Sequence, residues 1–232
     1  MEPAKKDNIE KKEDKLDFKG NFTEEHVQEI EKHLDFNQGN IADHYDKISS
    51  NYEEIYTHVG WPDPVENARF VKEISEAEKL NFDDVRILDF ACGTGLVGQY
   101  LSEHGFKNVD GCDASPDMLK ELAERRPDVY KNTKELFLGK PDSFPKEYHG
   151  AYTFTTASGV LADNHMGVDV YLEMIMSVKV GGWCCFNVRK EYMEPLGYGP
   201  GMDKLEKEGV WKKFKEATHF KYDQYKEQVG RF

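Results

Sequence analysis

"ILDFACGTGLVG", residues 87–98, decides the fold of this chain. A short apolar run leads into Asp89, and a turn that contains Gly93 and Gly95 follows at once. Glycine permits positive φ angles and lets a ligand press against bare backbone, so the pattern predicts a strand, a tight turn and a helix. Such a unit is the first crossover of a doubly wound fold, whose ligands bind at the carboxyl ends of the strands.

The following sequence alternates between short apolar runs and segments with helical periodicity. The apolar runs predict strands at residues 85–90, 109–113, 135–139, 151–158 and 183–188. Between two of them, Ser115 is the expected N-cap of a helix that starts with Pro116. We therefore expect an α/β fold with a doubly wound, Rossmann-like, mostly parallel sheet and helices on both faces.

Composition limits the partners and the compartment. The 232 residues, 38% hydrophobic, suffice for one large domain. The net charge of −13 repels phosphate backbones, so no nucleic-acid partner is expected. The four cysteines do not form a disulfide framework, and no apolar run approaches about 18 residues, which predicts a cytoplasmic protein that does not enter a membrane.

Three regions follow from the patterning. Residues 1–20 are a charge run and should form a disordered tail, residues 21–80 an N-terminal helical cap or lid, and residues 81–232 the core. Within the cap we expect helices from Thr23, over residues 41–60, and over residues 64–80. At the other end of the chain we expect a Gly/Pro-rich loop at 191–202, a helix at 202–214 and a strand at 217–225.

Two acids favour one kind of ligand over another. Gly93, Gly95 and Gly98 fit the G-x-G-x-x-G spacing of dinucleotide sites, which leaves a nicotinamide-dependent dehydrogenase open. Asp89 would repel phosphates beside that turn, whereas it would attract an ammonium group. Asp113 ends the next strand, where a carboxylate can accept hydrogen bonds from both ribose hydroxyls. Together they suggest an adenosine ligand with a positively charged amino-acid tail.

Three motifs carry a family resemblance. "LDFACGTG", "GCDASPDML" and "VKVGGW" resemble, in order and spacing, the motifs of class I S-adenosylmethionine-dependent methyltransferases over residues 40–190. "HYDKISSNYEEIYTHVGWPDP" and "TASGVLADNH" are most similar to the methyltransferase-like proteins of the Williams-Beuren syndrome region. The resemblance implies a seven-stranded sheet with an antiparallel last strand, and S-adenosylmethionine as cofactor with S-adenosylhomocysteine as its product.

The resemblance also assigns residues to the methyl donor. It implies that Asp89 lies near the methionine end of the cofactor and that Asp113 binds the ribose. The family often has an acid near the adenine where this chain has Lys140, and Asp142 could replace it. The other implied cofactor contacts come from the glycine loop, the adenine pocket, the end of the fourth strand and the lid: Ala91, Gly93, Gly95, Ala114, Met118, Ala157, Ser158, Gly159, Tyr45 and Tyr52.

Methyl transfer needs alignment more than a protein nucleophile, because the sulfonium methyl is already activated. His165, in "LADNHMG", is the expected catalytic base or acceptor-binding group. "TASGVL" stands where methyltransferases of nucleobase amino groups carry an Asn/Asp-Pro-Pro-aromatic motif, so we expect a small-molecule acceptor. Asn187 and Arg189 could anchor an acidic one. A protein side chain as acceptor, and a binding module without turnover, stay open, and no metal site is predicted.

Overall fold

The structure is a computed structural model that describes residues 28, 33 and 40–219. In this part of the chain five strands form one sheet in the order β3-β2-β1-β4-β5, and every neighbouring pair is parallel. The predicted doubly wound, Rossmann-like sheet is confirmed. The chain moves outward from β1 through β2 to β3 on one side and continues with β4 and β5 on the other. The strands are β1 (Arg86–Phe90), β2 (Asn108–Asp113), β3 (Tyr130–Glu135), β4 (Tyr152–Leu161) and β5 (Val178–Val188).

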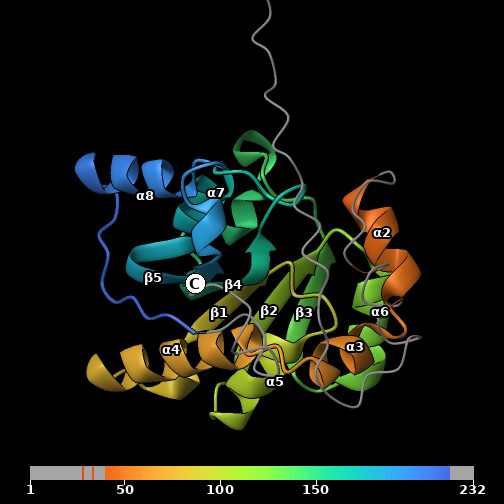
Figure 1. The fold of residues 1–232 in the computed structure, drawn as a ribbon. Helices are drawn as coiled ribbons and strands as arrows, with labels where there is room; N and C mark the ends of the chain where they lie inside the picture. The colour runs from red at the N-terminus through yellow and green to blue at the C-terminus, as the bar shows by residue number, and fades with distance from the viewer. Residues whose placement is uncertain (1–27, 29–32, 34–39, 220–232) are drawn as a thin grey trace, which may run out of the picture.

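Helices cover both faces of this sheet (Figure 1). On one face, α4 and α5 bury Val71 and Leu101 against Ile87 of β1. On the other, α7 and α8 pack Met174 and other apolar side chains against Leu88. Adjacent residues of β1 thus face opposite layers, as the period of a strand requires. The helices are α2 (Ile41–Ile48), α3 (Tyr52–His58), α4 (Asp63–Ala77), α5 (Leu96–Glu103), α6 (Pro116–Arg125), α7 (Val170–Ser177) and α8 (Tyr198–Lys207).

The expected strand at 135–139 is wrong in position. β3 spans Tyr130–Glu135 and reads YKNTKE, with only Tyr130 buried. It lies at the edge of the sheet, so its side chains face solvent and leave no apolar run to detect. The apolar residues 136–138 come after the strand and line a cavity instead.

The N-terminal helices differ from the predicted cap in two respects. Residues 41–60 form two helices, α2 and α3, because a turn interrupts them at residues 49–51. That turn reads Ser-Ser-Asn, residue types whose side chains compete with helical hydrogen bonds. The third predicted helix, α4, packs on one face of the sheet as part of the core domain and does not belong to the cap.

The C-terminal part also departs from expectation. α8 begins at Tyr198, inside the segment expected to be a loop, and ends at Lys207, before the expected helix end. Gly197, with φ +76°, precedes the helix, and the buried Tyr198 anchors it. Residues 217–219 form no strand. The rest of that predicted strand and the predicted tail at 1–20 lie outside the described residues, as does most of the helix expected from Thr23, of which Gln28 and His33 are helical.

Across the described residues, helices are too short or too polar to traverse a lipid bilayer.

Candidate functional site

The turn after β1 has an unusual backbone. Ala91, Gly93 and Gly95 all have positive φ, at +48°, +53° and +94°. The left-handed conformation costs energy for a residue with a side chain, so Ala91 is held there by its surroundings, as at many ligand sites. A Cβ on Gly93 would meet nothing within 4 Å, whereas one on Gly95 would lie 2.9 Å from the ring of Tyr130. Gly93 is therefore needed for its conformation and Gly95 for space as well.

The third glycine of the pattern serves the protein's own packing. A Cβ on Gly98 would lie 2.3 Å from the ring of Tyr130. The backbone N–H of Gly98 donates to the Tyr130 hydroxyl at 3.0 Å. Tyr130 thus accounts for Gly95 and Gly98, and the positive φ of the turn accounts for Gly93, so the spacing does not require a pyrophosphate.

Asp89 lies beneath the turn and is only 1% exposed. Its carboxylate accepts hydrogen bonds from the Tyr130 hydroxyl and the Thr156 hydroxyl, both at 2.7 Å. Burial raises the pKa of Asp89 to about 7, although these two donors oppose the shift. Asp89 is a support of the turn and is not among the residues that line the cavity above it.

A cavity opens above the carboxyl ends of β1, β2 and β4, where the chain changes direction across the sheet. Its volume is about 910 Å³ with the open mouth included. The lid helices α2 and α3 contribute one wall. Of the residues predicted from the sequence, the cavity is lined by Tyr45, Tyr52, Ala91, Gly93, Asp113, Ala114, Met118, Ser158, Gly159 and His165.

The other predicted residues lie outside the lining. Ala157 is fully buried in the core shared with α7 and α8. Gly95 is the last residue of the turn, and its Cα side faces Tyr130 and not the cavity. Asp142 is exposed in the short 3₁₀ turn Pro141–Ser143. The expected approach of Asp142 to the adenine pocket therefore has no counterpart in this arrangement.

Several lining residues were missed by sequence reasoning. Trp61 follows α3, and a Cβ on Gly159 would lie 2.7 Å from its indole ring. Leu136, Phe137 and Leu138 line the cavity from the segment after β3. Loops at the carboxyl ends of parallel strands lie at the same edge of a sheet. With β3 placed correctly, this rule would have put residues 136–138 at the cavity.

Asp113 ties two turns together. One carboxylate oxygen accepts from the Gly93 amide at 2.8 Å and the other from the Ser115 amide at 2.9 Å. Burial raises the pKa of Asp113, and these backbone donors oppose the shift. The side chain is thus held at the cavity wall in a fixed orientation.

The lid reaches the loop after β4 through Tyr45. Its hydroxyl lies 2.8 Å from Nε2 of His165, and Nδ1 of His165 lies 2.8 Å from the backbone carbonyl of Asp163. A carbonyl only accepts, so Nδ1 carries the proton and Nε2 accepts from Tyr45. Burial lowers the pKa of His165, which keeps the ring neutral near pH 7.

The loop that carries Lys140 is held from below by a buried acid. Glu173 of α7 accepts from the amides of Gly139 and Lys140 at 2.6 and 2.9 Å. Burial raises the pKa of Glu173, opposed by these two amides. Glu173 thereby fixes the backbone of residues 139 and 140 from helix α7.

Asn187 and Arg189 serve other purposes than the acceptor contacts expected of them. Asn187 accepts from the Gly159 amide at 3.0 Å and donates to Asp63 at 2.5 Å, so it fixes the end of β4. The guanidinium of Arg189 lies 3.8 Å from the carboxylate of Glu191. Neither Asn187 nor Arg189 lines the cavity.

Comparison with known proteins agrees with this geometry. Residues 87–182 match the family described as "Methyltransferase domain". The human "Methyltransferase-like protein 27" is 32% identical over 130 residues, 54% of this chain and 50% of that protein. "Protein arginine N-methyltransferase 1" of Saccharomyces cerevisiae is 35% identical over 81 residues, 32% of this chain and 23% of that protein. The chain thus spans at most half the length of these curated relatives.

A solved structure supports the fold. The TehB-like SAM-dependent methyltransferase of Corynebacterium glutamicum superposes with a TM-score of 0.50 at 15% identity, over 71% of this chain and 82% of that one. At this identity the likeness concerns the fold.

Proposed function

We propose that this chain, in which residues 87–182 match a methyltransferase domain, transfers the methyl group of S-adenosylmethionine to a small-molecule acceptor. The observation that carries the proposal is the cavity at the switch point of the sheet. It brings Asp113, the glycine turn and the end of β4 to one wall. Its walls are mainly apolar and aromatic with a few polar groups among them, such as Asp113, Ser158 and His165, which is the usual make-up of a small-molecule site.

The residues present fit the cofactor. Ser158 lines the cavity, and its buried hydroxyl has no hydrogen-bond partner among the described residues, so a bound ligand would satisfy it. Asp113 would accept the ribose hydroxyls, and Ala114 and Met118 would flank the adenine. Ala91 and Gly93 would lie under the methionine part. The ionised form of Asp89, below the turn, would favour the cationic end of the cofactor.

When bound, the cofactor supplies a methyl group that its sulfonium already activates. This chain's part is to align the acceptor and to exclude water. Tyr52 and Trp61 line the cavity with rings 6.3 Å apart, edge to face. A sulfonium against an aromatic face gains about 0.5–2 kcal/mol.

His165 is the proposed proton acceptor. Its Nε2 holds no proton and faces the Tyr45 hydroxyl. A proton leaving the methyl acceptor can pass to the Tyr45 oxygen while Tyr45 gives its own proton to Nε2. The lid thereby completes the site, because Tyr45 belongs to α2.

The test supplies methyl-labelled S-adenosylmethionine with two acceptor pools, a dialysable metabolite fraction and denatured cellular protein. Label in the metabolite fraction, lost in His165→Ala, is the expected result. Label confined to protein would instead mean a side-chain methyltransferase. Cofactor binding with no transfer to either pool would favour a binding module.

A further inference from the structure

Arg126 occupies a buried position at the C-terminal end of α6, where an exposed arginine would be ordinary. Its side chain is 7% exposed, against 38% for the neighbouring Arg125. Burying a guanidinium is costly unless every donor finds an acceptor. The contacts of Arg126 therefore indicate what the residue does.

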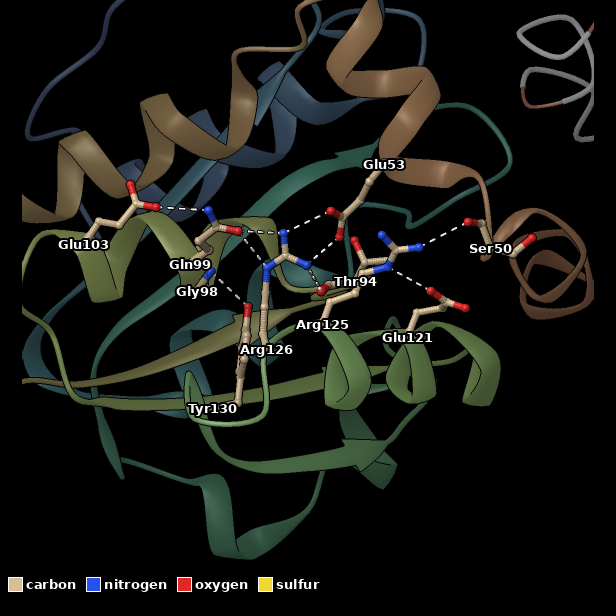
Figure 2. Close-up of polar contacts among 10 residues, drawn as sticks. All are labelled: Ser50, Glu53, Thr94, Gly98, Gln99, Glu103, Glu121, Arg125, Arg126 and Tyr130. Carbon is tan, nitrogen blue, oxygen red and sulfur yellow. Dashed lines mark hydrogen bonds and ion pairs between the residues drawn. The ribbon is translucent and has the colours of Figure 1, made fainter.

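All five N–H donors of Arg126 are used (Figure 2). Two go to the carboxylate of Glu53 at 2.5 and 3.1 Å, and one goes to the backbone carbonyl of Thr94 at 2.9 Å. The remaining two go to the side-chain oxygen of Gln99 at 3.0 and 2.7 Å. Gln99 donates in turn to Glu103 at 3.0 Å, which fixes its oxygen toward Arg126.

These partners belong to three separate elements. Glu53 lies on lid helix α3, beside Tyr52 of the cavity wall. Thr94 lies in the glycine turn between Gly93 and Gly95, and Gln99 lies on α5. Burial raises the pKa of Glu53, but hydrogen bonds from Arg126 and Thr94 and the positive charges of Arg126 and Arg125 together outweigh burial and leave that pKa below the usual range. The pair is therefore ionised at neutral pH.

The lid rests on α6 at two further points. Near the start of α6, Asp46 of α2 accepts from the Ser115 hydroxyl at 2.5 Å. Near its end, Arg125 donates to the carbonyl of Ser50 at 3.2 Å, in the turn between α2 and α3. Neither contact touches the glycine turn. Among these contacts, Arg126 joins the lid directly to the turn.

We propose that Arg126 is a positioning residue that couples lid helix α3 to the glycine turn, so that ligand binding at the turn and closure of α3 depend on each other. The inference rests on the proposed function, because the ligand at the turn is the cofactor. Coupling of this kind is reciprocal: what orders the turn also holds the lid. Tyr52, next to Glu53, is the side chain that the coupling places at the cavity.

The experiment measures S-adenosylhomocysteine binding by calorimetry and amide hydrogen exchange with and without this ligand, on the full chain. The variants are Arg126→Met, which keeps the aliphatic stem, Glu53→Gln, which keeps the shape of the partner, and their combination. Arg125→Met is the matched control. We expect both single variants to raise Kd about tenfold and the double variant to be no worse than either, because they remove one interaction. The ligand should protect the amides of α3 in the wild type and in Arg125→Met but not in Arg126→Met.

A merely structural role would lower thermal stability without changing ligand-induced protection of α3. Additive effects of the two single variants on Kd, or unchanged protection of α3 in Arg126→Met, would overturn the coupling. If Arg126→Met does not fold, Glu53→Gln is the test. The coupling would be overturned if Glu53→Gln binds S-adenosylhomocysteine with a Kd within about twofold of the wild type and keeps the ligand-induced protection of α3. A wild-type chain that binds no S-adenosylhomocysteine would overturn the proposed function itself, which is a different result.

Discussion

Tyr130 and Asp89 are joined by a 2.7 Å hydrogen bond across 41 residues of sequence, directly beneath the glycine turn. The same hydroxyl accepts from the amide of Gly98, so one tyrosine connects β3, the end of β1 and the start of α5. The turn that faces the cavity is therefore supported from an edge strand. Two predictions follow from this support and two from the lid.

Gly98→Ala should displace Tyr130, because the added Cβ would lie 2.3 Å from its ring. Overpacking of this kind costs about 1–3 kcal/mol of unfolding free energy. Chemical denaturation measures the loss. Gly167→Ala is the matched control, since nothing lies within 4 Å of its position and its φ is not positive. Equal stability of the two variants would contradict the packing role of Gly98.

Asp89 should make the protein less stable as pH rises toward neutrality. Burial first of all raises its pKa from 3.8 to about 7, so the folded state binds a proton that the unfolded state has lost. The contribution of protonated Asp89 to the free energy of unfolding is full below about pH 4 and disappears as pH rises through about 7. Between these values the free energy of unfolding falls by up to about 1.4 kcal/mol per pH unit. Urea denaturation across this range should show a flatter dependence for Asp89→Asn. Identical slopes for the two proteins would refute the shift.

Tyr45→Phe should slow methyl transfer while leaving cofactor affinity within about threefold of the wild type, because it removes the donor to His165 and keeps the ring. A loss of about 100-fold or more in kcat is expected for a hydroxyl in the proton path, since positioned acid–base groups contribute roughly 10²–10⁴-fold. Tyr192→Phe, whose hydroxyl contacts Arg189 away from the cavity, is the control. Full activity of Tyr45→Phe would remove the tyrosine from the proton path.

The acid limb of the rate profile should lie below pH 6.5. Burial lowers the pKa of His165 from 6.5, so the neutral base persists to more acidic solution than an exposed histidine would. The profile of kcat against pH measures this limb. The acid limb should be absent from the pH profile of the residual activity of His165→Gln. An acid limb that persists in this variant would mean that another group titrates there and not His165.

The sequence patterns predicted the buried half of the fold well. β1, β2 and β4 carry mostly buried residues because layers of helices cover them. β5 lies at the other edge of the sheet, and the prediction found only its second half, because residues 179–181 are exposed. Ser115 caps α6 as expected, accepting from the Met118 amide at 3.0 Å. β3 escaped detection because its side chains face solvent. α8 escaped because Gly199, Pro200 and Gly201 suggest a turn, whereas tertiary packing of Tyr198 sustains a helix.

The site was predictable where a backbone conformation or a strand end identifies it, as for Gly93 and Asp113. It was not predictable where function depends on contacts between distant segments. Arg126 and Glu53 are 73 residues apart, and nothing local distinguishes Arg126 from the exposed Arg125 before it. Trp61 lies at the cavity because its ring packs against Gly159 of β4, about 100 residues later in the sequence.

The most direct test of the cofactor site is calorimetric titration of the purified chain with S-adenosylmethionine, S-adenosylhomocysteine and NAD in parallel. Saturable binding of both sulfur ligands and none of NAD is predicted. Asp113→Ala should weaken binding about 10–100-fold, because it removes a charged acceptor for the ribose hydroxyls, a contact of about 1.5–3 kcal/mol. Binding of NAD alone, or no binding of either sulfur ligand by a folded sample, would contradict the assignment.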